Sequence, residues 1–287
     1  MDFLRKFINL ILYSSLWIAV CAAAQVQLTY ILTGNPQDLD QFTLFVFSST
    51  IGLYGVHRLV GIRIVRAFEN EGRFAVIKHY KSHIIVYSIA GFIASGILFI
   101  LLPIQTWFYL IIPIAISAAY VIPTNKAGKR LRDLPLVKIF LLAASWSMLT
   151  TTVPLLNIGF TESGPLVLIF IERFLFVFAI TIPFDIRDMD VDNGTGLRTL
   201  PHVLGIKQSK ILAVAVLTLS TGATALLVTR EIYSADIVQP YSVFFILAAL
   251  LIWGSNSKRS DYYYSGLLDG TMMLLYLLLV IWRFFSY

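Results

Sequence analysis

The sequence predicts an all-helical protein that crosses a membrane several times. Of its 287 residues, 58% are hydrophobic and only 13% are charged, and the mean hydropathy is +0.80. The apolar residues form unbroken runs of roughly 20 residues, the length that a helix needs to cross the hydrocarbon core. A backbone in lipid must satisfy its own hydrogen bonds, so each run is expected to be helical. These features exclude a soluble, disordered or collagen-like protein.

About nine apolar runs follow one another along the chain, and each is expected to form one span. They cover residues 8–32, 42–60, 84–102, 107–122, 136–156, 166–184, 211–228, 237–253 and 267–282. The fourth and eighth runs are the shortest and contain Pro113 and Pro240. Only short connections remain between the runs, so residues 1–287 are expected to form one transmembrane domain.

Positive charge indicates the orientation of this bundle. Except for Arg173, Arg230 and Arg283, the 22 Lys and Arg residues lie at the amino terminus or in the even-numbered loops. The positive-inside rule predicts a cytoplasmic amino terminus, cytoplasmic loops that include 58–83, 123–138 and 185–210, and an external carboxyl terminus, in an inner or plasma membrane. The net charge of +6 follows from this topology. It favours contact with anionic membrane lipids, and nothing in it calls for nucleic acid.

The first run permits a second interpretation. Arg5 and Lys6 precede an apolar stretch that reaches three alanines at 22–24, a pattern that resembles a cleavable signal peptide. The apolar run then resumes as far as Leu32, which favours a spanning helix over cleavage within residues 1–24. Cys21 is the only cysteine, which excludes an internal disulfide.

Acidic residues gather where the sixth run ends. Of 16 Asp and Glu residues, four lie between positions 185 and 192, namely Asp185, Asp188, Asp190 and Asp192. If the helix continues past Phe184 at ~100° per residue, all of them except Asp190 share one face. Like charges this close repel each other and favour a bound cation, and oxygen ligands favour Mg²⁺. Because Mg²⁺ is usually shared with substrate phosphates, the cluster indicates a lipid diphosphate; the alternative is a solvated acidic turn.

Residues 184–205 (FDIRDMDVDNGTGLRTLPHVLG) resemble the second aspartate-rich motif of the UbiA-type intramembrane prenyltransferases. That motif reads D-x-x-D-x-x-x-D, followed by Gly, Arg or Lys, Thr and Leu-Pro. The positions that match are Asp185, Asp188, Asp192, Gly196, Arg198, Thr199 and Pro201. The expected nine helices and the functional second and sixth loops agree with the same family. The resemblance implies a UbiA-like bundle in which Asp185, Asp188 and Asp192 hold Mg²⁺ and act in catalysis.

The family's first motif, N-D-x-x-D-x-x-x-D at the end of the second span, has no counterpart here. The aligned positions hold Tyr54, Gly55, Arg58 and Ile62, so no carboxylate remains and the first metal site is expected to be absent. Thr50, Tyr54, His57 and Arg58 nevertheless form a polar stripe at helical spacing. Such a stripe is expected to face the bundle interior.

Arg58 therefore has three interpretations. Its guanidinium is suited to binding phosphate oxygens directly. Alternatively it is simply the first residue of a positive loop, or it pairs permanently with Asp185 or Asp188. The fourth loop, 120–130 (YVIPTNKAGKR), loosely resembles the family's tyrosine followed by basic residues. The residues expected at the diphosphate are thus Tyr54, His57, Arg58, Lys126, Lys129, Arg130 and Arg198.

The resemblance implies an enzyme that transfers an isoprenyl group from a Mg²⁺-bound isoprenyl diphosphate to a lipophilic acceptor. Two other functions stay open: a non-catalytic isoprenoid-diphosphate binder or scaffold on the same fold, and a transporter whose pathway contains Glu172 and Arg173. A structural role is the other interpretation of this charged pair, with each member expected to find a partner on another helix. Asp269 is expected to be either a partner of a loop lysine or a buried acid at a helix start.

Overall fold

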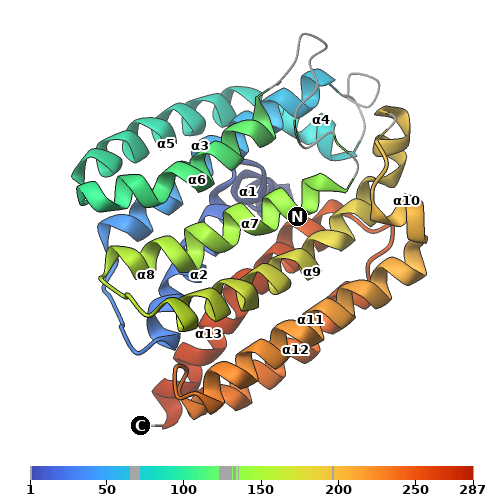
Figure 1. Cartoon of the computed structure of the whole chain (residues 1–287). Helices are drawn as coiled ribbons and strands as arrows, with labels where there is room; N and C mark the ends of the chain where they lie inside the picture. The colour runs from blue at the N-terminus through green and yellow to red at the C-terminus, as the bar shows by residue number, and fades with distance from the viewer. Residues whose placement is uncertain are drawn as a thin grey trace.

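The computed structural model describes residues 2–64, 72–122, 131, 134, 136–195 and 197–286. These residues form helices joined by turns, and no strand occurs among them. The elements of Figure 1 are α1 (Asp2–Tyr13), α2 (Leu16–Leu32), α3 (Gln41–Ile64), α4 (Gly72–His79), α5 (Lys81–Leu101), α6 (Ile104–Val121), α7 (Val137–Ser147), η3 (Met148–Thr152), α8 (Val153–Asn157), α9 (Ser163–Thr195), α10 (Leu200–Leu204), α11 (Ile206–Thr229), η4 (Ala235–Ile237), α12 (Val238–Trp253), η5 (Tyr263–Leu268) and α13 (Asp269–Ser286). The predicted all-helical membrane fold is confirmed.

Within the described ranges, seven helical segments are long and apolar enough to cross a membrane. They are Gln41–Ile62, Lys81–Leu101, Val137–Asn157, Ser163–Gly194, Ile206–Thr229, Ala235–Trp253 and Tyr263–Ser286. The helices α1 and α2 together pass the same test but are bent by 56°, where Ser15 takes a left-handed φ of 69°. The apolar part of α6, Ile104–Tyr120, is shorter. The predicted count of nine spans is therefore not confirmed, and the orientation of the termini stays a prediction.

The helices pack in an order that differs from their order along the chain. Neighbouring pairs run from α5 through α3, α2, α13, α12, α11, α9 and α7 to α6 (Figure 1). Only Leu102 and Pro103 separate α5 from α6, so the two ends of this series of neighbours are joined. Close approach of α3 and α5 depends on Gly91, where an added Cβ would lie 2.7 Å from the Ser48 carbonyl oxygen.

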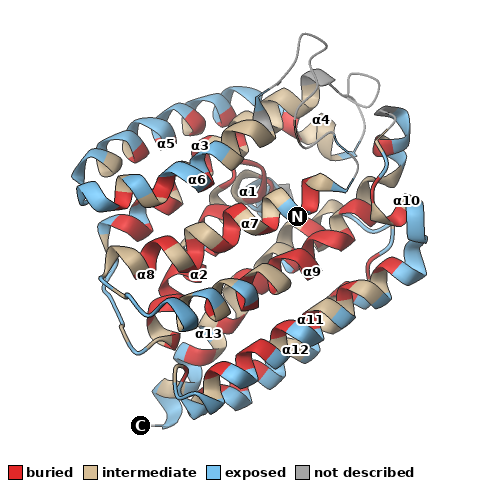
Figure 2. Ribbon diagram, viewed as in Figure 1, coloured by how far each residue is buried: buried red, intermediate tan, exposed pale blue. Residues whose placement is uncertain are grey.

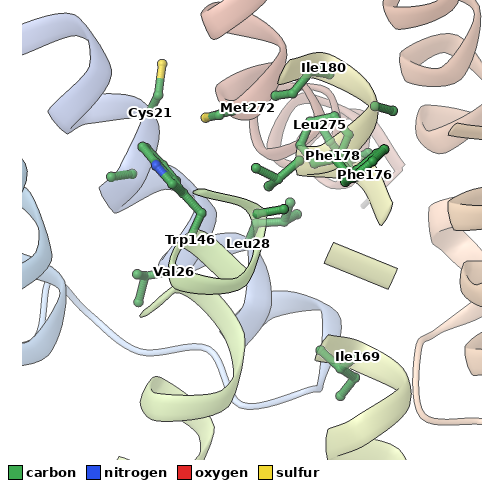
Figure 3. Packing of buried hydrophobic residues seen from close by; sticks show 14 of the residues in the cluster. Cys21, Val26, Leu28, Trp146, Ile169, Phe176, Phe178, Ile180, Met272 and Leu275 are labelled. Carbon is green, nitrogen blue, oxygen red and sulfur yellow. The ribbon is translucent and has the colours of Figure 1, made fainter. Parts of the chain in front are cut away.

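The outer faces of the bundle are apolar. On α5, Ile89, Ile93, Ile97 and Ile100 are each more than half exposed, and exposed positions also follow α6, α11 and α12 (Figure 2). Apolar side chains in such number at a surface indicate contact with lipid. The buried core lies between α2, α7, α9 and α13, as the side chains of Val26, Trp146, Ile180 and Met272 show (Figure 3).

Candidate functional site

A cavity of about 520 Å³ lies inside the bundle, and its lining changes from polar to apolar along its length. The polar end is formed where α3 ends, α7 begins and α9 leaves the bundle. Its charged side chains are Arg58, Arg73, Lys138, Arg187, Asp188, Asp192, Asp261 and Asp269. The apolar part is lined by Val46, Leu53, Leu142, Trp146, Leu149 and Met272. This shape suits a molecule with a charged head and a hydrocarbon tail.

Two π-helical turns contribute residues to the cavity wall. The turn η3 interrupts the helix that begins as α7 and places Leu149 and Thr150 on the cavity wall. The turn η5 precedes α13 and contributes Ser265. Such turns insert an extra residue into a helix and are frequent at functional sites. Neither turn is evident from the apolar pattern of the sequence.

The helix α9 continues as predicted past Phe184, and it carries the aspartate cluster to Thr195. Asp185 is 1% exposed and accepts a hydrogen bond from the Lys138 ammonium at 2.7 Å. It does not line the cavity, whereas Lys138 does. Asp190 is exposed, as its expected angle on the helix requires. Lys138, at the start of α7, therefore neutralises the first aspartate of the cluster.

Asp188 lies in a larger network of ion pairs. Its carboxylate accepts hydrogen bonds from Arg73 on α4 and from the neighbouring Arg187, each at 2.7 Å. Arg187 also donates to Asp261 at 2.8 Å, and the Tyr13 hydroxyl donates to the other oxygen of Asp261 at 2.8 Å. Burial raises the pKa of the Asp261 carboxyl, but the positive charges of Arg187 and Arg73 lower it by more than burial raises it. The pKa of Asp261 therefore lies below its usual range.

These ion pairs bear directly on the predicted metal site. Among the described residues, no group of three or more His, Cys, Asp or Glu side chains is placed to hold a metal ion. Basic side chains from α4, α7 and α9 lie against Asp185 and Asp188, so the three carboxylates do not converge on one point, and their role as metal ligands stays a prediction. Asp188 and Asp192 still line the cavity together. Mg²⁺ usually binds through one or two carboxylates and substrate phosphates, so these two residues fit an ion that arrives with a diphosphate.

Arg58 lies on the cavity wall as predicted, in the place of a motif carboxylate. Its Nη1 atom is buried without a hydrogen-bond partner in the described structure, and its guanidinium lies over the Tyr13 ring at 5.6 Å from the centroid. No ion pair joins it to Asp185 or Asp188 among the described residues. The permanent pairing considered from the sequence is thus absent there, and a buried guanidinium donor faces the cavity.

The other predicted head-group residues have different outcomes. Tyr54 and His57 line the cavity, with Tyr54 edge-on to Trp146 at 6.2 Å. Arg198 is exposed and does not line it. The basic residues of the fourth loop, Lys126, Lys129 and Arg130, lie outside the described residues.

Sequence reasoning missed several residues of the polar end. Arg73, Lys138 and Arg187 were counted only as positive charges of loops, and Asp261 was not singled out. The one available signal was the alternation of acid and base around Arg187. Asp269, the first residue of α13, is half-buried and lines the cavity, and the helix runs into it without a break from η5, so it is not an acid at a helix start.

Glu172 and Arg173 are both buried, deep in α9. Contrary to expectation they lie against each other, with the Arg173 Nε atom 3.7 Å from the Glu172 carboxylate. Arg173 also donates hydrogen bonds to the Gln25 carbonyl oxygen at 3.2 Å, Thr29 Oγ1 at 3.2 Å and Thr150 Oγ1 at 3.3 Å. These contacts tie α9 to α2 and η3, as the structural interpretation of the pair requires.

The fold defines an integral, multi-pass membrane protein with a cavity among its helices. The UbiA homologue from Archaeoglobus fulgidus bound to DMAPP and Mg²⁺ superposes with a TM-score of 0.65 at 14% identity, over 96% of this chain and 98% of the homologue. The structure described as digeranylgeranylglyceryl phosphate synthase gives 0.58 at 16%, over 98% of both chains. The apo UbiA homologue from Aeropyrum pernix K1 gives 0.59 at 15%, over 94% and 96%.

The chain therefore has the UbiA-type fold, as the sequence resemblance implied. No family model matches the sequence. No curated protein matches it either.

Proposed function

We propose that the chain binds an isoprenyl diphosphate in this cavity and transfers the isoprenyl group to a lipophilic acceptor. The observation that carries the proposal is the cavity itself, which joins a charged end containing the unpartnered Arg58 donor to an apolar part walled by Trp146 and Leu149. Solved UbiA homologues bound to DMAPP or GPP with Mg²⁺ support this class of donor.

In the transfer, the allylic carbon–oxygen bond breaks and the diphosphate leaves with its electron pair. An electron pair of the acceptor then forms the new bond to that carbon, and the acceptor releases a proton. Arg58, Arg73 and Arg187 donate hydrogen bonds to the leaving oxygens and stabilise their growing charge. The apolar wall excludes water, so that the acceptor meets the allylic cation before hydrolysis does. Trp146 and Tyr54 present aromatic rings that stabilise such a cation.

Charge at the polar end indicates a role for a further cation. The lining contains four basic and four acidic side chains within the described residues, so it has no excess of positive charge to offset a diphosphate. Mg²⁺ held by Asp188 and Asp192 supplies this neutralisation when bound. Binding of a diphosphate is therefore expected to strengthen when Mg²⁺ is added.

Transfer is tested with the purified chain in lipid nanodiscs, a radiolabelled geranyl diphosphate and a membrane lipid extract as acceptor. The expected result is label in an extractable lipid together with one diphosphate released for each transfer. Arg58→Ala is expected to lower the rate at least tenfold, because it removes the donor that replaces a motif carboxylate. Arg230→Ala removes an exposed arginine away from the cavity and is the matched control.

A non-catalytic isoprenoid-diphosphate binder is the second candidate function. The ion pairs of Asp185 and Asp188 favour it, because they hold two motif carboxylates against basic side chains of the protein. In the same nanodiscs this candidate predicts saturable, Mg²⁺-dependent binding of the labelled donor with neither transfer nor diphosphate release. Absence of binding would refute both candidates.

A further inference from the structure

One carboxylate of the cavity lining has no ion pair. The acidic lining residues are Asp188, Asp192, Asp261 and Asp269. Asp188 and Asp261 accept hydrogen bonds from arginine side chains at 2.7 and 2.8 Å, and Asp192 faces the cavity from α9 as a proposed ligand of Mg²⁺. Asp269 accepts no hydrogen bond and joins no ion pair in the part of the chain that the structure describes. An unpaired carboxyl group within a membrane bundle is costly and usually marks a function.

The helix α2 holds the backbone on both sides of this carboxyl group. The Trp17 indole nitrogen donates a hydrogen bond to the Gly266 carbonyl oxygen at 3.0 Å, within the π-turn η5. The Gln25 side-chain amide donates to the Met272 carbonyl oxygen. These two contacts lie three residues before and three residues after Asp269. They fix the face that this part of the helix turns toward the cavity, so Asp269 is held on the wall by its surroundings.

Asp269 lies where the lining changes from charged to apolar. Along its own helical segment the charged lining residue Asp261 precedes it and the apolar lining residue Met272 follows it. On α3, both Arg58 and Tyr54 lie close enough to interact with it electrostatically. Arg58 carries the unpartnered donor assigned to the diphosphate, and Tyr54 carries one of the rings assigned to the allylic cation. Asp269 is therefore beside the place where the diphosphate of a bound donor meets its isoprenyl chain.

We propose that Asp269 is the base that accepts the proton released by the acceptor. The allylic carbon–oxygen bond breaks, and an electron pair of the acceptor forms the new bond to that carbon. The acceptor's O–H or C–H bond then breaks, its electrons stay with the acceptor, and its proton moves to a carboxylate oxygen of Asp269. The proton passes to water when the products leave. This inference rests on the proposed function and assigns it a further catalytic residue.

The same assignment narrows the class of acceptor. A lipophile that is alkylated next to a base must have a proton to lose at the position where the new bond forms. A hydroxyl group and an electron-rich aromatic ring both meet this condition, whereas a saturated hydrocarbon does not. Asp188 and Asp261 are poorly suited to take this proton, because protonation would break the ion pairs that they form with arginine.

The test measures how well transfer is coupled to diphosphate release. The full chain is placed in nanodiscs with Mg²⁺, labelled geranyl diphosphate and a membrane lipid extract, and label in lipid is compared with diphosphate released. The unmodified chain is expected to give a ratio near one. Asp269→Asn should lower transfer at least about tenfold but diphosphate release less than about threefold, because the carbon–oxygen bond still breaks and water captures the cation as labelled geraniol. A ratio that stays near one in Asp269→Asn, whether or not the overall rate falls, would overturn the proposal.

Two matched variants separate this role from others. Asp38→Asn makes the same change at an exposed position outside the cavity and is expected to keep the ratio of the unmodified chain. His57 is another possible base of the lining, so His57→Gln is measured in parallel. Uncoupling in His57→Gln with full coupling in Asp269→Asn would move the role to the histidine and overturn the proposal.

A second variant decides the question if Asp269→Asn does not fold. Asp269→Ala removes the carboxyl group and leaves space for a small carboxylate, so adding formate is expected to raise transfer at least about fivefold, while chloride at the same concentration should not. Equal effects of formate and chloride would overturn the proposal. Absence of both transfer and diphosphate release in the unmodified chain would instead refute the proposed function itself.

Discussion

Replacing Lys138 by methionine tests the ion pair that holds the first aspartate of the cluster. Asp185 is 1% exposed, the Lys138 side chain is 11% exposed, and their atoms are 2.7 Å apart. Removing one partner of a buried ion pair leaves a charge with little solvation and costs about 3–5 kcal/mol. For a chain of this size, ~2–4 °C of melting temperature corresponds to each kcal/mol, so Lys138→Met is expected to lower Tm by roughly 6–20 °C.

The assay is thermal unfolding in detergent, followed by intrinsic tryptophan fluorescence. The double variant Lys138→Met, Asp185→Asn removes both charges, and it is expected to recover more than half of the loss. Lys207→Met is the matched control, because Lys207 is exposed and lies outside the cavity. A loss below about 1 kcal/mol in the single variant, or a double variant less stable than the single one, would refute the reasoning.

Three further outcomes are expected. Gly91→Val places a side chain against the Ser48 carbonyl oxygen where α3 contacts α5. This variant is expected to reduce the free energy of unfolding by about 1–3 kcal/mol in the same assay. Gly164→Val, at an exposed glycine with nothing within 4 Å, should change the free energy of unfolding far less. Because the pKa of Asp261 is lowered in the folded protein, its carboxylate stabilises the fold fully above its ordinary pKa near 3.8, and this stabilisation is lost as the pH falls through the folded pKa. Asp261→Asn should therefore be less stable than the unmodified chain at pH 7, and the difference in stability should shrink below pH 4. Asp192→Asn is expected to weaken the enhancement of diphosphate binding by Mg²⁺ at least fivefold, measured by isothermal titration with and without EDTA; an undiminished enhancement would place the ion elsewhere.

The membrane class, the helical fold and the location of the acidic cluster could be predicted from the sequence. Each depends on local chemistry: a backbone in lipid must be helical, and Asp185, Asp188 and Asp192 share a helical face wherever α9 continues. The polar stripe of α3 was predictable for the same reason, because helical spacing places Tyr54, His57 and Arg58 on one side.

Tertiary structure alone decided which charges meet. Lys138 lies 47 positions from Asp185 along the chain, and Arg73 lies 115 positions from Asp188, so no local sequence pattern predicts either ion pair. Their pairing places basic side chains of the protein against Asp185 and Asp188, which helical spacing alone does not indicate. The lining of the cavity depends in the same way on residues from α2, α3, η3, α9 and α13 that meet only after packing. Helix spacing assigns a side chain to a face, but the distance between two faces is set by the contacts of the assembled bundle.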